Sequence, residues 1–195
     1  MGRLAAKKPF AWGMQTTSSS RLAAALALSL AAGLPAHAAD DVSLADLKAA
    51  TRSLGFLQNP PHADGFVLGI VYAPGTANGK SLAQQTADRI RGLPGPNDKG
   101  LKAEPIAVGD LAAHTDRLDV LYLVSGTAGN AAAIVDLARR RHLLVVSNDP
   151  ACLEQNCCML MVRDTGRVEI VLDSALAQSA GIAFSSVFAM MVKHK

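Results

Sequence analysis

Residues 119–146 read DVLYLVSGTAGNAAAIVDLARRRHLLVV, and this stretch decides the fold. It begins with an apolar run at 119–124 and ends with another at 143–146, as expected of strands that are buried on both faces of a sheet. Between them, residues 128–140 form a helical pattern. Cations follow at its carboxyl end (139–141), where they stabilise a helix. A strand, a helix and a second strand in this order predict a parallel sheet with a crossover helix.

The chain before this stretch continues the same alternation. An apolar run at 66–72 predicts a third buried strand, and residues 78–93 predict a helix. A weaker strand at 101–108 contains Pro105, which lacks an amide donor, so we expect this strand near the edge of the sheet. An opening helix should begin at Ser43, because Ser-Leu-Ala-Asp resembles a capping box.

The pattern changes towards the C-terminus. Segments 158–163 and 167–172 flank an Asp-Thr-Gly turn and predict a β-hairpin, which two short helices follow at 173–180 and 185–192. The fold class is therefore α/β, with a largely parallel sheet flanked by helices and a C-terminal β-hairpin added to the sheet.

The N-terminal 38 residues are typical of a secretory signal. They contain four basic residues and no acid, then the apolar run 22–34, then Ala-His-Ala at 36–38 as a cleavage site. The signal is complete whether it starts at Met1 or at Met14. We expect a single mature domain at 39–195 and, in a Gram-negative bacterium, a periplasmic location.

Removing the signal changes the charge of the protein. The full chain of 195 residues has a formal net charge of +3, with 50% hydrophobic and 18% charged residues. The mature chain keeps 15 basic and 16 acidic residues, which gives a net charge of −1. Nucleic-acid binding proteins usually have a strong basic excess, so no nucleic-acid partner is expected.

The loops that follow two predicted strands form a weak candidate site for a small ligand. Ser125, Gly126 and Thr127 lie between a strand and a helix, where small residues and backbone amides can hold an anion. Asn148 follows the neighbouring strand. Ligands of open parallel sheets bind beyond the carboxyl ends of the strands, so these four residues are the candidates. An ordinary turn is the simpler interpretation.

The three cysteines of the chain lie close together, at Cys152, Cys157 and Cys158. In an oxidising compartment we expect a disulfide, either structural or redox-responsive. Cys152–Cys158 is the favoured pair and Cys152–Cys157 the alternative, because adjacent cysteines bond only with strained geometry. A thiolate metal site with Met159 and Met161 is a further alternative. No Cys-x-x-Cys motif and no nearby histidine at ligand spacing favours it, so no metal site is predicted.

No motif of catalysis is found in the sequence. It has no Gly-x-Ser-x-Gly and no His-Glu-x-x-His, and its five histidines are scattered. The glycine-containing segment 75–81 has one residue too few between its glycines for a phosphate-binding loop, with Pro74 at the required position. We therefore expect neither an enzyme nor a cofactor.

The C-terminal third resembles the YfiR-like family of periplasmic proteins. The resemblance rests on LVVSNDP at 144–150, CCML at 157–160, GRVEI at 166–170, and DSALAQSAG with IAFSS across 173–186. It extends in outline over 43–192. The resemblance implies a periplasmic repressor that binds an inner-membrane sensor protein, with a diguanylate cyclase as the expected partner, and control through disulfide oxidation. A homodimer is a further possible assembly of the protein. The alternative function is a periplasmic small-ligand or metal-binding protein.

Overall fold

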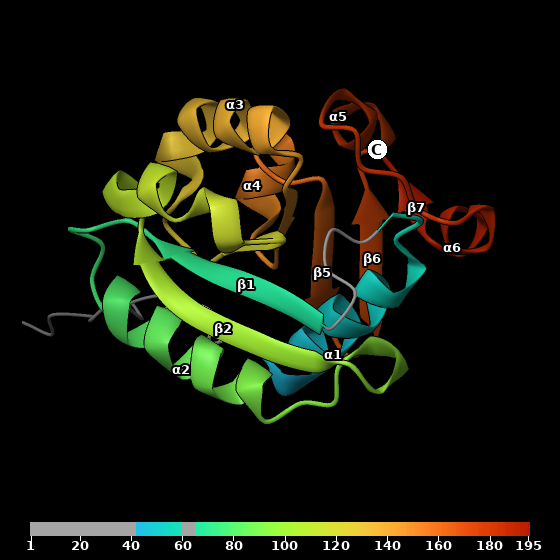
Figure 1. Cartoon of the computed structure of the whole chain (residues 1–195), viewed down its shortest axis with the longest axis horizontal. Helices are drawn as coiled ribbons and strands as arrows, with labels where there is room; N and C mark the ends of the chain where they lie inside the picture. The colour runs from blue at the N-terminus through green and yellow to red at the C-terminus, as the bar shows by residue number, and fades with distance from the viewer. Residues whose placement is uncertain (1–41, 60–64) are drawn as a thin grey trace, which may run out of the picture. The chain divides into compact units, whose positions relative to one another are not determined.

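The computed structural model describes residues 42–59 and 65–195 (Figure 1). Within these residues one sheet has seven strands in the order β2-β1-β3-β4-β5-β6-β7. The predicted signal at 1–38 lies outside the described residues. The strands are β1 (Gly65–Tyr72), β2 (Gly100–Ala107), β3 (Val120–Leu123), β4 (Leu144–Ser147), β5 (Leu160–Asp164), β6 (Val168–Leu172) and β7 (Lys193–His194).

The direction of the strands confirms the predicted fold class. Strands β2, β1, β3, β4 and β5 run parallel to one another, whereas β5 and β6 form the antiparallel hairpin. Strand β2, which contains Pro105, is at the edge, as its missing amide donor requires. The outer side of β6 pairs with β7 only at Val171 and Leu172.

Helices cover the two faces of this sheet. Figure 1 shows α1 and α2 on one side, and α3 and α4 on the other. The α-helices are α1 (Leu44–Ser53), α2 (Gly79–Arg91), α3 (Ala131–Arg141), α4 (Pro150–Glu154), α5 (Ser174–Ser179) and α6 (Ser186–Met191). Short 3₁₀ segments are η1 (Leu54–Phe56), η2 (Pro96–Asp98), η3 (Val108–Ala113), η4 (Thr115–Arg117) and η5 (Ala128–Asn130).

The first helix begins at the predicted capping box. The amide of Asp46 donates to Ser43 Oγ over 2.9 Å, and the amide of Ser43 donates to Asp46 Oδ2 over 3.3 Å. Two helix donors without intrahelical partners are thereby satisfied. Leu47 and Leu54 of this segment are buried in the core, whereas Leu44, which shares their spacing, is 48% exposed.

Two short elements were not predicted. Helix α4 begins at Pro150, with Asp149 Oδ1 accepting from the amide of Ala151 over 2.9 Å. It spans five residues, which is too short to show helical periodicity. Strand β7 has two residues and exists through its pairing with β6.

Candidate functional site

The structure places the four candidate ligand residues at one edge of the sheet. Ser125, Gly126 and Thr127 follow β3, and Asn148 follows β4, which is the parallel neighbour of β3. The carboxyl ends of these strands therefore meet as predicted. Thr127 and Asn148 are buried, Ser125 is half-buried and Gly126 is exposed.

The polar side chains of these loops bind other parts of the protein. Thr127 Oγ1 donates to Val124 O over 2.9 Å, which closes its own turn. Asn148 Nδ2 lies 3.4 Å from Oδ2 of the buried Asp46 on α1. Asn148 Oδ1 is buried and has no hydrogen-bond partner among the described residues. The geometry therefore makes Asn148 part of the contact between α1 and the sheet.

The favoured cysteine pairing is wrong. Cys152 is bonded to Cys157, with 4.9 Å between their Cα atoms, and Cys158 is a free, buried cysteine. The backbone explains this choice, because Asn156 takes a left-handed conformation with a φ of 54°. The chain turns back after α4, and the amide of Cys157 donates to Cys152 O over 2.7 Å. The pair that forms is therefore Cys152–Cys157, which the sequence analysis gave as the alternative.

The remaining thiol has no access to solvent. Cys158 is fully buried, and its burial raises the pKa of the thiol to about 12. The charges of Asp149 and Asp173 raise this pKa further, while that of Lys195 lowers it. A thiol with such a pKa is almost entirely protonated at neutral pH, so it is a poor nucleophile and a poor metal ligand.

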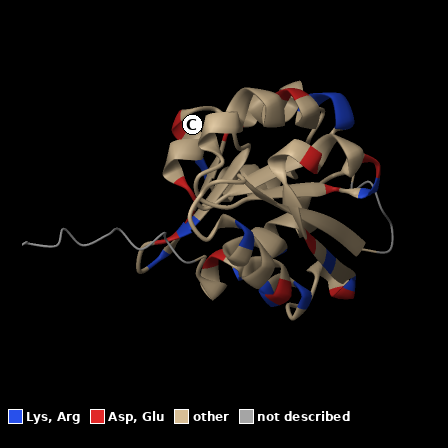
Figure 2. Cartoon of the chain, turned by 90° about the vertical axis from the view of Figure 1, so that its left-hand side faces the viewer, with Lys and Arg blue, Asp and Glu red and all other residues tan. Residues whose placement is uncertain are grey.

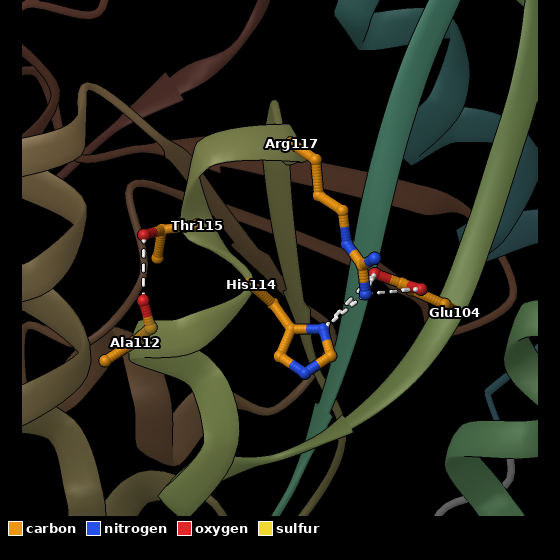
Figure 3. Close-up of polar contacts among 5 residues, drawn as sticks. All are labelled: Glu104, Ala112, His114, Thr115 and Arg117. Carbon is orange, nitrogen blue, oxygen red and sulfur yellow. Dashed lines mark hydrogen bonds and ion pairs between the residues drawn. The ribbon is translucent and has the colours of Figure 1, made fainter.

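A polar cluster near the edge strand has a structural role (Figure 3). Arg117 Nη2 lies 3.0 Å from Oε1 and 3.2 Å from Oε2 of Glu104 on β2. His114 Nδ1 lies 2.5 Å from the same Nη2. The guanidinium of Arg117 therefore contacts both Glu104 and His114. The cluster joins η4 to the edge strand.

A groove of about 750 Å³ lies between α1 and the C-terminal part of the sheet. We call it the α1–β6 groove. Its apolar lining comes from α1, η1, β6 and the segment around α6, and comprises Ala45, Ala49, Phe56, Val168, Ile170, Phe188, Met191 and Val192. The ring of Phe188 stacks on that of Phe56, with 5.0 Å between their centroids. None of the four loop candidates lines this groove.

The rim of the groove is basic. Lys48 and Arg52 are one helical turn apart on α1, and Arg167 and Lys193 lie on the β6 side. Glu169, the one acidic residue of the lining, forms an ion pair with Lys193. This contact and the charge of Lys193 hold the pKa of the Glu169 carboxyl below its usual value. The lining therefore has four cations and one anion.

Apolar side chains next to the groove are open to solvent. On α6, Val187 is 55% exposed, Met190 79% and Met191 63%. Val168, at the start of β6, is 40% exposed. Exposed apolar groups beside a concave surface are typical of an interaction site. The sequence did not reveal this site, because its two walls come from 45–56 and 165–193, which are far apart in the chain.

Charged residues elsewhere are mixed in sign. Figure 2 shows Lys and Arg mixed with Asp and Glu over the described part of the chain, and strand β2, with Lys102 and Glu104, also carries both signs. Within residues 42–59 and 65–195, no group of three or more His, Cys, Asp or Glu side chains could hold a metal ion. No helix in that part of the chain combines the length and the apolar character that crossing a membrane requires.

Two solved structures show a similar fold. One is the ABC domain in complex with L-Trp from Streptococcus pneumonia, with a TM-score of 0.53 and 12% identity. The other is a conserved domain protein from Vibrio cholerae O1 biovar eltor, with a TM-score of 0.52 and 14% identity. They match 74% and 70% of this chain, which spans 59% and 57% of theirs. At this identity the match concerns the fold alone.

The family of the chain follows from comparison of its sequence with known protein families. No curated protein matches the chain. The model of a domain family described as YfiR/HmsC-like matches residues 54–191, which is more than half of the chain and includes β1 to β6 and α6. This family consists of regulatory proteins of the periplasm. The chain therefore belongs to the YfiR/HmsC-like family.

Proposed function

We propose that the protein is an exported regulator that binds an inner-membrane sensor protein in the periplasm and represses it. The expected partner is a diguanylate cyclase, so that the protein would lower the level of cyclic di-GMP. Export would use the signal at 1–38. The observation that carries this proposal is the family match over 54–191, since the family is regulatory and periplasmic.

The described surface supports a binding role. The α1–β6 groove combines an apolar lining with a basic rim and adjoins exposed apolar residues of α6. Surfaces of this composition are typical of protein interfaces, which have an apolar centre and a polar rim. The candidate loops give less support to the small-ligand alternative, because Thr127 and Asn148 bind within the protein.

Two measurements test this function. Affinity-tagged protein, exported to the periplasm, is cross-linked in cells, and membrane proteins joined to it are identified by mass spectrometry. Cyclic di-GMP is measured in cells with and without the gene. We expect one cyclase to be cross-linked and the nucleotide level to rise on deletion. An unchanged level with no cross-linked membrane protein would overturn the proposal.

A further inference from the structure

The outer edge of β6 is open where it borders the α1–β6 groove. Among the described residues, β6 has a strand on its outer side only at Val171 and Leu172, so the edge at 168–170 has none. The same three residues line the groove. An open strand edge beside a groove can accept an extended peptide as an additional strand.

The backbone at this edge has the orientation that strand addition needs. The carbonyl of Arg167 accepts from the amide of Thr165 over 3.3 Å, inside the hairpin. In a trans peptide the carbonyl and the following amide point in opposite directions. The amide of Val168 therefore points outward, towards the open edge.

The charge of the groove defines the chemistry of its occupant. The groove is lined by four basic side chains, Lys48 and Arg52 on one wall and Arg167 and Lys193 on the other. Its lining contains one carboxylate, that of Glu169. Complementary charge steers partners to an interface and selects among them. Side chains of an extended segment alternate between two faces. Apolar side chains on one face of such a segment can therefore fill the groove, while acidic side chains on its other face contact the basic rim.

We propose that the α1–β6 groove binds an acidic, apolar segment of the partner protein in an extended conformation, added as a strand to the outer edge of β6. This inference rests on the proposed function, because it names where and how the regulator would hold its partner. A membrane surface is the competing occupant. The groove is concave and bordered by an open strand edge, which suits a peptide better than a flat lipid surface.

The test uses the full exported protein and a labelled peptide in which Glu or Asp alternates with Val or Phe. We expect binding that weakens with added salt, and new protection of the Val168 amide from hydrogen exchange. Lys48→Glu with Arg52→Glu should weaken binding about tenfold or more. The matched variant, Lys80→Glu with Lys102→Glu, has the same charge change at exposed positions outside the groove and should bind normally. Val168→Pro removes the outward amide and should also weaken binding.

Three results would overturn the inference. They are no binding of the acidic peptide, equal binding by the groove and control variants, and binding only to vesicles of phosphatidylethanolamine and phosphatidylglycerol. If the groove variant is still cross-linked to a cyclase in cells, the groove is not the binding site, and the proposed function stands. If the peptide binds at the groove but no membrane protein is cross-linked in cells, the proposed function is wrong and the groove remains a peptide-binding site.

Discussion

Lys195 donates from its Nζ to Oδ1 of Asn156 over 2.5 Å. Asn156 is the left-handed residue of the turn that the disulfide between Cys152 and Cys157 closes. The same Nζ donates to the carbonyl of Leu153 over 2.5 Å. The disulfide turn therefore holds Lys195 through two hydrogen bonds.

Lys195 connects this turn to the sheet. Its amide donates to Leu172 O of β6 over 3.1 Å, directly after β7. Lys193, within β7, lines the α1–β6 groove. The disulfide turn is thus linked through β7 to one wall of the groove, and its oxidation state should affect the order of that wall.

Replacing Cys152 and Cys157 by serine should therefore have two effects. The free energy of unfolding should fall by about 2 kcal/mol, because the bridge restricts a short loop of the unfolded chain. Amide hydrogen exchange at 193–195 should become faster, because the turn no longer fixes Asn156. Urea unfolding and hydrogen exchange measure these changes.

A reductant provides the control for this experiment. It should destabilise the unmodified protein to the level of the double variant and leave the variant unchanged. An equal loss of stability in both proteins on reduction would show that the Cys152–Cys157 bridge is not the source of the effect.

The buried thiol of Cys158 predicts a loss of stability at alkaline pH. Its pKa is raised from 9.0 to about 12 in the folded protein, mainly by burial. Below pH 9.0 the thiol keeps its proton in both the folded and the unfolded protein, so its contribution to the stability of the fold is fully present. Between pH 9.0 and about 12 only the unfolded state releases it, so stability falls by up to about 1.4 kcal/mol per pH unit.

Cys158→Ala should remove this contribution. Urea unfolding across the same pH range should show a shallower decline for the variant than for the unmodified protein. The buried Tyr122, whose pKa is also raised by burial, contributes equally to both proteins. Parallel declines would contradict the assignment to Cys158.

Local sequence patterns were sufficient to predict most of the sheet. The strands β1, β3 and β4 are continuous apolar runs, and the hairpin of β5 and β6 surrounds a turn with Gly166 at a φ of +91°. Pro105 marked the edge strand, and Ser43 with Asp46 marked the start of α1. Each of these signals lies within a few residues of the feature that it predicts.

The features that were missed depend either on local backbone conformation or on contacts between distant segments. The pairing of Cys152 with Cys157 follows from the backbone of Asn156, which residue types alone do not define. Strand β7 exists because it pairs with β6. The α1–β6 groove needs both of its walls, so neither half of the sequence could reveal it.

Gly126 should not tolerate a side chain. Its φ is +89°, and an added Cβ would lie 2.7 Å from Thr76 Cγ2. Gly126→Ala should therefore lower the free energy of unfolding by about 1–3 kcal/mol. Gly75→Ala is the matched control, because Gly75 has a similar φ of +96° and no atom within 4 Å of an added Cβ.

The difference between these two variants measures the contact with Thr76. Adding Thr76→Ala to Gly126→Ala should recover part of the lost stability, because it removes the atom that the new Cβ meets first. Equal losses in both glycine variants, with no recovery, would assign the whole effect to backbone strain. Thermal unfolding of the four proteins gives these values.

The carboxylate of Asp46 should be the main polar link between α1 and the sheet. It is buried, and its Oδ1 accepts from the amide of Asp164 at the end of β5 over 2.6 Å. Its Oδ2 accepts from the amide of Ser43. Asp46→Asn replaces one of these acceptors with a donor, which should lower the free energy of unfolding by about 2–3 kcal/mol.

Ser43→Ala separates the two roles of this carboxylate. It removes the Oγ that caps α1 and keeps the bond to Asp164, so it should cost about 1 kcal/mol. The excess loss in Asp46→Asn, measured by urea unfolding, then reports the link to β5. If both variants lose the same stability, the 2.6 Å bond contributes nothing measurable, and apolar packing alone holds α1 on the sheet.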